Sequence, residues 1–279
     1  MEIVIGKNAG FCFGVKRAAE EAYRCLETGV DCATLGPLIH NPQEVERLRQ
    51  AGIGCVDSPD EVNQGQTMII RSHGAAPEVY AEAERLGIPV IDATCPHVAA
   101  IHRLVMEYSS DGSAVIIVGE AKHPEVRVIA GWAQGDVCIL NDPKEAEAAQ
   151  LPGRALVVAQ TTLRREHFES VLDVIRTRVP DLTVRSTICA ATSQRQEEAE
   201  KLSSEADVMI VVGGHNSSNT NKLYETCRQR CERSYLIETA DEVPSCDIRQ
   251  TDRVALTAGA STPQWLLNEV AQRLEHLFD

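Results

Sequence analysis

The stretch Val90-Ile91-Asp92-Ala93-Thr94-Cys95-Pro96 joins a short apolar run to a predicted helix over Pro96 to Tyr108, with a cysteine at the junction. Proline is favoured at the first helical position, because the N–H at that position has no partner within the helix. Cys95 is therefore expected at the positive end of the helix dipole, where a thiolate is stabilised. The order apolar run, cysteine, helix predicts a reactive or metal-binding thiol at a strand-to-helix turn.

Two other cysteines stand in comparable settings. Cys12 lies in Gly10-Phe11-Cys12-Phe13-Gly14, and Cys189 lies in Thr187-Ile188-Cys189-Ala190-Ala191-Thr192. Thiolates are ligands for soft metals, so these three cysteines are the candidate metal ligands. Buried packing is the ordinary role of a lone cysteine, and no Cys-x-x-Cys pair is present, so spacing alone does not establish a metal site.

Runs rich in valine and isoleucine alternate with amphipathic helical segments along the whole chain. Such alternation predicts an α/β fold with mostly parallel sheets. Each interval between the three cysteines holds about four strands, enough for one small α/β unit. We therefore predict three domains of similar build, over residues 13–95, 96–188 and 189–279, with an N-terminal strand in 1–12 joining the third.

The composition argues against several classes of protein. A net charge of −14 disfavours a nucleic-acid binder, which needs a basic face, and 4% aromatic residues disfavour a base-stacking platform. No apolar run is long enough to span a membrane, and the residues from Met1 to Ile5 do not resemble a signal peptide. We expect a cytoplasmic protein with no nucleic-acid or membrane partner, and its 10 cysteines are expected to be reduced thiols.

Polar residues gather at the predicted carboxyl ends of the strands. Ligands bind beyond these ends in open α/β sheets, and histidines, hydroxyls and a carboxamide suit an oxyanion such as a diphosphate. The same residue types also serve as turns, helix caps and surface groups, which leaves an ordinary structural role open. The residues concerned are His40, Ser72-His73-Gly74, His123-Pro124-Glu125, Gln160-Thr161-Thr162, Ser217-Ser218-Asn219 and Ser261.

The motifs together resemble the LytB/IspH family of 4-hydroxy-3-methylbut-2-enyl diphosphate reductases. They follow the order of that family from the N-terminus almost to the last residue, and one departure is Phe13, where many members carry a smaller residue. The motifs that carry the resemblance are Gly10-Phe11-Cys12, Ile39-His40-Asn41, Ser72-His73-Gly74, Asp92-Ala93-Thr94-Cys95-Pro96, His123-Pro124-Glu125-Val126, Gln160-Thr161-Thr162-Leu163, Ile188-Cys189-Ala190-Ala191-Thr192, Asn216-Ser217-Ser218-Asn219 and Thr257-Ala258-Gly259-Ala260-Ser261.

The resemblance implies a pseudo-threefold (trefoil) arrangement of three α/β domains around one 4Fe-4S cluster. Cys12, Cys95 and Cys189 would each bind one iron, and the fourth iron would have no protein ligand. An iron with an open position acts as a Lewis acid, while the cluster supplies electrons. The implied reaction removes the allylic hydroxyl of the substrate by two-electron reduction and gives isopentenyl and dimethylallyl diphosphates.

The resemblance also assigns roles to the polar residues. Glu125 is expected to donate the proton, helped by His123 and Thr161. The diphosphate is expected to be bound by His40, His73, His123, Thr161, Ser217, Ser218, Asn219 and Ser261. The expected electron donor is a ferredoxin or flavodoxin, and the expected assembly is a monomer or weak dimer.

The same sequence leaves two alternative functions and one further metal site to consider. A non-catalytic redox or metal-binding sensor of phosphate ligands would use the same residues without turnover, and a hydrolytic metalloenzyme is disfavoured by a thiolate-rich site. Cys227 and Cys231 are four apart on a predicted helix, but two cysteines are a thin ligand set, so packing is preferred. We expect structural or solvated roles for His97, His102, His167 and His276, and no role is assigned to His215.

Overall fold

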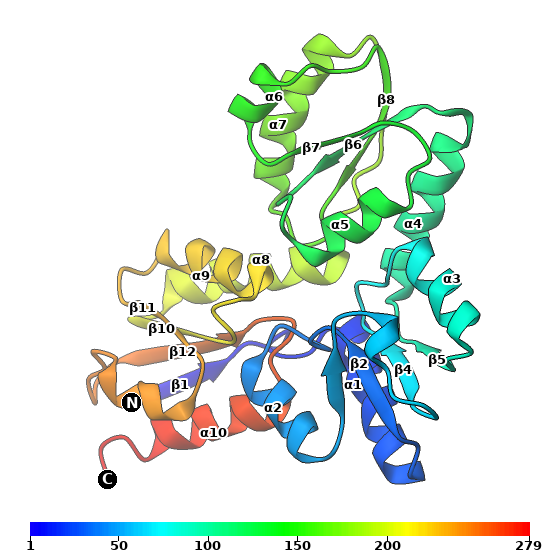
Figure 1. Cartoon of the computed structure of the whole chain (residues 1–279). Coiled ribbons are helices and arrows are strands. Elements are labelled where there is room, and N and C mark those ends of the chain that lie inside the picture. Colours follow the sequence, from blue (N-terminus) through cyan, green and yellow to red (C-terminus); the bar gives the residue numbers. More distant parts are fainter. The chain divides into compact units, whose positions relative to one another are not determined.

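The computed structural model describes residues 1–279 and contains three four-stranded sheets in which every paired strand is parallel (Figure 1). The prediction of an α/β fold with parallel sheets is confirmed. The chain forms two compact units: unit 1 comprises residues 1–16, 39–47 and 190–279, and unit 2 comprises residues 17–38 and 48–189. No helix is both long and apolar enough to cross a membrane.

Sheet A lies in unit 1 and has the strand order β1-β12-β10-β11. The first strand pairs with the last, so that Ile3 lies opposite Val254. Helices α8 and α9 cover one face, and α10 covers the other (Figure 1). The bounds are β1 Glu2–Ile5, β10 Val208–Val212, β11 Ser234–Ile237, β12 Arg253–Ala258, α8 Ala190–Glu205, α9 Ser218–Arg228 and α10 Gln264–Glu275, with a 3-10 helix over Ala240–Ser245.

Both faces of sheet A are buried, which explains the unbroken apolar run of β10. Ile210 packs with Leu266 and Val270 of α10, whereas its neighbour Met209 packs with Leu223 of α9 on the opposite face. Successive side chains of a strand point to opposite faces, so a parallel strand covered by helices on both sides needs apolar residues at every position.

Sheet B lies in unit 2 and has the order β3-β2-β4-β5. Its central strand β4 contributes Met68 and Ile70, which pack with Ala83 of α3. The segment 39–47, which contains the start of α2, leaves this sheet and belongs to unit 1. The bounds are β2 Cys32–Leu35, β3 Gly54–Val56, β4 Thr67–Ile70, β5 Val90–Asp92, α1 Phe13–Thr28, α2 Pro42–Gln50 and α3 Pro77–Leu86, with a 3-10 helix over Pro59–Glu61.

Sheet C also lies in unit 2 and has the order β7-β6-β8-β9. Ile116 of β6 packs with Phe168 of α7, and Ile117 packs with Val105 of α4 and Ile129 of α5 on the other face. The bounds are α4 Pro96–Tyr108, β6 Ala114–Val118, α5 Pro124–Gly131, β7 Val137–Leu140, α6 Pro143–Ala148, β8 Arg154–Ala159, α7 Arg165–Arg178 and β9 Asp181–Val184, with a 3-10 helix over Ser109–Asp111.

Each sheet takes its strands from one of the predicted segments, with β1 added to sheet A. Strands β2 to β5 lie within 13–95, β6 to β9 within 96–188, and β10 to β12 within 189–279, while β1 lies within 1–12 and joins sheet A. The predicted helix from Pro96 to Tyr108 has these bounds in α4. Local signals set these ends, because proline is suited to the first helical turn and the apolar positions recur at the helical period.

Candidate active site

Each of the three candidate ligand cysteines precedes a helix directly. Cys12 comes before α1, Cys95 before α4 and Cys189 before α8. None of the three is in a disulfide, and all are partly exposed. A helix start is suited to an anionic sulfur, because unpaired N–H groups and the helix dipole both favour negative charge there.

The backbone of each cysteine is tied to a neighbouring strand-end loop. The N–H groups of Cys12, Cys95 and Cys189 donate to the carbonyl oxygens of Ala260, Ser72 and Thr161, at 3.1, 3.0 and 3.0 Å. These three acceptors follow β12, β4 and β8, one central strand of each sheet. Each cysteine therefore lies beside a strand-end loop that carries a predicted substrate residue. The residue is Ser261 for Cys12, His73 for Cys95 and Thr161 for Cys189.

Three of the other cysteines, Cys32, Cys227 and Cys246, differ from these in being buried. Burial is the main cause that raises the pKa of Cys32 and of Cys227 to about 12 and the pKa of Cys246 to about 11, so these thiols keep their protons. A cluster ligand must be a thiolate. The accessible thiols Cys12, Cys95 and Cys189 fit an iron–sulfur cluster as donors, whereas the buried cysteines do not.

Cys227 and Cys231 pack in the core between α8, α9 and sheet A. Cys227 is the penultimate residue of α9, but Cys231 lies beyond the end of that helix, so the prediction that both share a helix is wrong. The Cys231 sulfur lies 3.6 Å from the carbonyl oxygens of Ala206 and Asp207. These surroundings agree with the preferred structural role.

Glu125 is a buried carboxylate that Thr161 contacts at both oxygens. The Thr161 N–H donates to Oε1 and the Thr161 hydroxyl donates to Oε2, both at 2.6 Å. Glu125 is 2% exposed and Thr161 6%. Glu125 lies in the first turn of α5, where negative charge is favoured, but its burial and its contacts with Thr161 distinguish it from an ordinary surface residue of a first turn.

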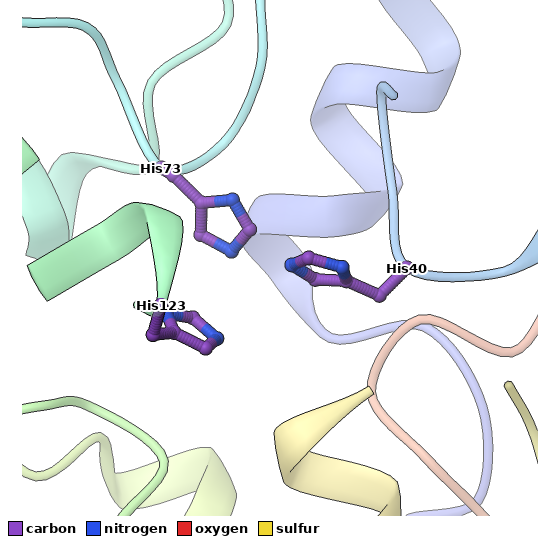
Figure 2. Close-up of side chains that lie close together, drawn as sticks. All are labelled: His40, His73 and His123. Carbon is purple, nitrogen blue, oxygen red and sulfur yellow. The ribbon is translucent and has the colours of Figure 1, made fainter. Parts of the chain in front are cut away.

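His123 precedes α5 and caps it. Its Nδ1 accepts a hydrogen bond from the Glu125 N–H at 3.2 Å, so the proton of the neutral ring lies on Nε2. The rings of His73 and His123 are in edge contact, with centroids 5.6 Å apart and an interplanar angle of 80° (Figure 2). Unit 2 thus brings together four of the predicted site residues: His73, His123, Glu125 and Thr161.

Unit 1 brings together a second set of predicted residues around the ends of β10 and β12. The Ser261 hydroxyl donates to the His40 carbonyl oxygen at 3.2 Å and lies 3.4 Å from the Ser217 hydroxyl. Gly214 allows this approach, because a Cβ at that position would lie 2.8 Å from the His40 carbonyl oxygen. The loop after β10 and the segment of His40 therefore meet through backbone and hydroxyl groups.

The start of α9 carries Ser218 and Asn219. Ser217 is the N-cap residue, and its hydroxyl accepts from the Thr220 N–H at 3.3 Å. Asn219 is 8% exposed, and its Nδ2 has no hydrogen-bond partner in the protein. A buried amide donor without a partner is costly in a folded protein, so a bound acceptor such as a phosphate oxygen would compensate it.

Two residues beside these sets were not singled out as site residues from the sequence. Lys222 donates to the Ser218 hydroxyl at 2.7 Å and brings a positive charge to the start of α9. Asn41 is fully buried, and its Oδ1 caps α2 through the Glu44 N–H while its Nδ2 has no partner. The spacing of four residues from Ser218 on a helix was the signal for Lys222.

The other histidines have structural or exposed positions. His97 and His102 lie in α4 and His167 lies in α7. His276 follows α10 and pairs with Asp279 at 2.6 Å, and the exposed His215 donates its N–H to Glu238 at 2.7 Å. The contact with Asp279 on the surface agrees with the solvated role predicted for His276.

A family model described as LytB protein matches residues 3–275. The chain belongs to the LytB protein family. The family predicted from the sequence motifs is therefore confirmed, over nearly the whole chain.

Two relatives of the LytB family are named 4-hydroxy-3-methylbut-2-enyl diphosphate reductase. The protein of Caldanaerobacter subterraneus subsp. tengcongensis is 42% identical over 281 residues, covering 99% of this chain and 98% of its own. The protein of Geobacter sulfurreducens is 44% identical over 277 residues, covering 99% and 97%.

Two solved structures are similar to the chain. One is described as (E)-4-hydroxy-3-methyl-but-2-enyl diphosphate reductase, the terminal enzyme of the non-mevalonate pathway, with a TM-score of 0.74, 40% identity and 99% coverage of both chains. The other is the E-1-hydroxy-2-methyl-but-2-enyl-4-diphosphate reductase from Plasmodium falciparum, with a TM-score of 0.89, 26% identity and coverage of 99% of this chain and 88% of that one.

Proposed function

We propose that this LytB-family chain is a 4-hydroxy-3-methylbut-2-enyl diphosphate reductase. The reaction replaces the allylic C–O bond with a C–H bond, consumes two electrons and two protons, and releases water. The observation that carries the proposal is the repeated hydrogen bond from a cysteine N–H to a strand-end loop that bears a polar site residue. Thiolates for a redox centre and donors for an anionic substrate are thereby built on the same loops.

Cys12, Cys95 and Cys189 are the residues that would hold one 4Fe-4S cluster per chain. Such a cluster supplies electrons and, at an iron without a protein ligand, a Lewis acid for the substrate hydroxyl. The three thiols are partly exposed and none is in a disulfide, so their sulfurs can take up iron. A ferredoxin or flavodoxin is the class of donor suited to delivering single electrons to it.

Glu125 is proposed as the proton donor, with Thr161 as the residue that holds it. The Thr161 hydroxyl donates to the ionised carboxylate and, after rotation, accepts from the protonated acid, so the pair accommodates both states. Burial favours the neutral acid, and a nearby anionic substrate favours it further. His123 is fixed by its contact with the Glu125 N–H, and this supports a role for His123 beside the acid.

The diphosphate is proposed to be bound by His40, His73, His123, Ser217, Ser218, Asn219 and Ser261, with Thr161 beside the reacting hydroxyl. Most of these groups are neutral donors, which bind an anion without the desolvation cost of additional buried charge. The unpartnered Nδ2 of Asn219 supports this assignment, because it lacks an acceptor in the protein itself.

The domain boundaries and the assembly complete the proposal. We propose the segments 13–95, 96–188 and 189–279, with 1–12 joining the third, as three domains, since each sheet takes its strands from one of them. A monomer or weak dimer in the cytoplasm is the proposed form.

Anaerobic purification tests the proposal directly. The expected result is a brown protein with about four irons and matching sulfide that turns over the diphosphate substrate when reduced. Cys95→Ser should lose most of the iron, whereas Cys55→Ser, which changes an exposed cysteine, should not. A colourless protein with full activity would refute the proposal.

Glu125→Gln separates the reductase from a non-catalytic sensor. The substitution should abolish turnover while iron content and pyrophosphate binding persist, because the amide keeps the shape but donates no proton. A protein whose function survives this substitution would be a sensor and not a reductase.

A further inference from the structure

Each helix that starts after a candidate ligand cysteine also holds the loop of a different one. The contacts use side-chain donors within the first two turns of α8, α1 and α4, and backbone carbonyl acceptors just before Cys12, Cys95 and Cys189. Each of the three contacts lies within a single compact unit. Arg195, Arg17 and His97 have no part in the proposed reaction, and these contacts give them a different role.

Arg195 of α8 makes the strongest of the three contacts. Its Nε donates to the Asn8 carbonyl at 2.9 Å and its Nη2 to the Gly10 carbonyl at 2.8 Å, two residues before Cys12. The arginine is 4% exposed, so these carbonyls compensate a buried charge. Glu198, on the same helix, accepts from the N–H groups of Lys7 and Asn8 at 2.9 and 2.8 Å.

Arg17 of α1 makes the equivalent contact to the loop of Cys95. Its Nη1 donates to the Thr94 carbonyl at 2.7 Å and its Nη2 to the Asp92 carbonyl at 3.1 Å. Asp92 in turn accepts from the Thr94 N–H at 2.9 Å and from the Thr94 hydroxyl. The planar fork of the arginine suits two carbonyls of one loop, which a lysine cannot contact with fixed geometry.

His97 of α4 makes the weakest contact, to the loop of Cys189. Its Nε2 lies 3.1 Å from the Thr187 carbonyl oxygen, two residues before Cys189, and must carry the proton because a carbonyl only accepts. The Thr187 hydroxyl bonds both the N–H and the carbonyl of Ala159 at the end of β8. This loop is therefore held from α4 and from sheet C.

We propose that Arg17, His97 and Arg195 are positioning residues for the loops of Cys95, Cys189 and Cys12, respectively, each holding the loop by its backbone carbonyls. The inference deepens the proposed function, because it concerns the three cysteines assigned there to the cluster. A loop held by fixed hydrogen bonds presents its sulfur in one place, which reduces the entropy lost on assembly and slows the loss of iron.

The test measures the reactivity of each cysteine in the apoprotein, so it does not depend on cluster chemistry. Arg195→Met, Arg17→Met and His97→Phe are treated with iodoacetamide, and the labelling rate of every cysteine is measured by peptide mass spectrometry. Matched controls are Lys201→Met on α8, Arg24→Met on α1 and His167→Phe on α7, the last of which removes a 2.6 Å contact to the Asn141 carbonyl, outside the cysteine loops.

Each substitution is expected to raise the labelling rate of one particular cysteine. Labelling should rise about tenfold at Cys12 in Arg195→Met, somewhat less at Cys95 in Arg17→Met, and least at Cys189 in His97→Phe, because a lost charge-assisted hydrogen bond shifts loop opening by about that factor. Equal rises at all three cysteines in each variant, or rates equal to the controls, would overturn the proposal. If Arg195→Met does not fold by circular dichroism, Arg195→Lys replaces it, with a smaller rise at the same cysteine.

The rate of iron release tests whether the same contacts help to retain the cluster. In reconstituted protein, the rate of iron release to a chelator should rise roughly three- to tenfold in Arg195→Lys and Arg17→Lys relative to Lys201→Met and Arg24→Met. Unchanged release would overturn the role in retaining the cluster. A protein that binds no iron but gives the specific labelling pattern would refute the proposed function while supporting the positioning of the loops.

Discussion

Thr161 contacts both carboxylate oxygens of Glu125, through its N–H and its hydroxyl, at 2.6 Å each. The same residue accepts the Cys189 N–H at its carbonyl. Thr161 therefore joins the proposed proton donor to the loop of a proposed cluster ligand. A substitution at this position changes the environment of the acid without removing it.

Thr161→Val should lower turnover by about 10²-fold, because general acid catalysis contributes about 10²–10⁴-fold and the buried carboxylate loses the hydroxyl donor of Thr161. Iron content should not change, since the valine backbone keeps the contact with Cys189. The measurement is kcat with a chemical reductant, beside iron analysis. Thr162→Val, which loses only a contact with Gln160, is the control. Wild-type kcat in Thr161→Val would contradict the assignment of the pair.

Asn219→Ala should mainly weaken pyrophosphate binding, whereas Asn221→Ala should mainly lower the stability of the fold. The Asn219 Nδ2 has no partner in the protein, so its removal should change the free energy of unfolding by less than about 1 kcal/mol but weaken pyrophosphate binding about tenfold. The Asn221 Nδ2 donates to the carbonyls of His215 and Ser217, so its loss should cost about 1–2 kcal/mol of stability. Calorimetry and urea unfolding measure the two quantities. A destabilised Asn219→Ala with unchanged pyrophosphate affinity would contradict the ligand role.

His102 should make the stability of the apoprotein fall in mild acid. Burial, the main cause, lowers the pKa of His102 to about 4, against the opposing charge of Asp92 and with a smaller contribution from Arg103. The unfolded chain binds this proton near pH 6.5 and the folded chain only near pH 4. The folded state therefore keeps its full stability above about pH 6.5 and loses about 2–3 kcal/mol as the pH falls to about 4.

His102→Phe tests this source of pH dependence, because a phenyl ring preserves the stacked contact with Trp132, whose ring centroid lies 5.4 Å from that of His102. Urea unfolding of the apoprotein at pH 7 and pH 5 should show a smaller difference in the variant than in the wild type. An unchanged difference would assign the acid sensitivity to other groups.

Cluster formation should protect three cysteines from alkylation and leave a fourth exposed. In the native apoprotein at pH 8, iodoacetamide should label Cys12, Cys95, Cys189 and the exposed Cys55, but not Cys227, since burial raises the pKa of that thiol to about 12. After reconstitution, only Cys55 should react. Labelling of Cys12 at the same rate with and without iron would remove it from the ligand set.

Local sequence signals predicted most of the fold. The helix from Pro96 to Tyr108 follows from a proline at its first position and apolar residues at helical spacing. Runs rich in valine and isoleucine predicted the strands, and one of them, Val208–Val212, forms β10, whose side chains pack on both faces of sheet A.

The site was predictable in its residue types and not in its contacts. The motifs identified the cysteines, Glu125 and the strand-end hydroxyls, but not Lys222 or the three positioning residues. Arginines on amphipathic helices are common, and nothing in the local sequence of Arg17 or Arg195 distinguishes them from solvated residues. Their acceptors are backbone carbonyls, which every residue provides, so no motif marks them.

The sequence by itself determined the alternation of strands and helices, the placement of Cys12, Cys95 and Cys189 before three helices, and the family of the chain. These features depend on neighbouring residues, which set helix starts and apolar periodicity. Only the tertiary structure decided that Glu125 meets Thr161, 36 residues away, and that Arg195 meets Gly10, 185 residues away. Such hydrogen bonds depend on the register and packing of whole sheets, and short-range patterns in the chain carry no information about them.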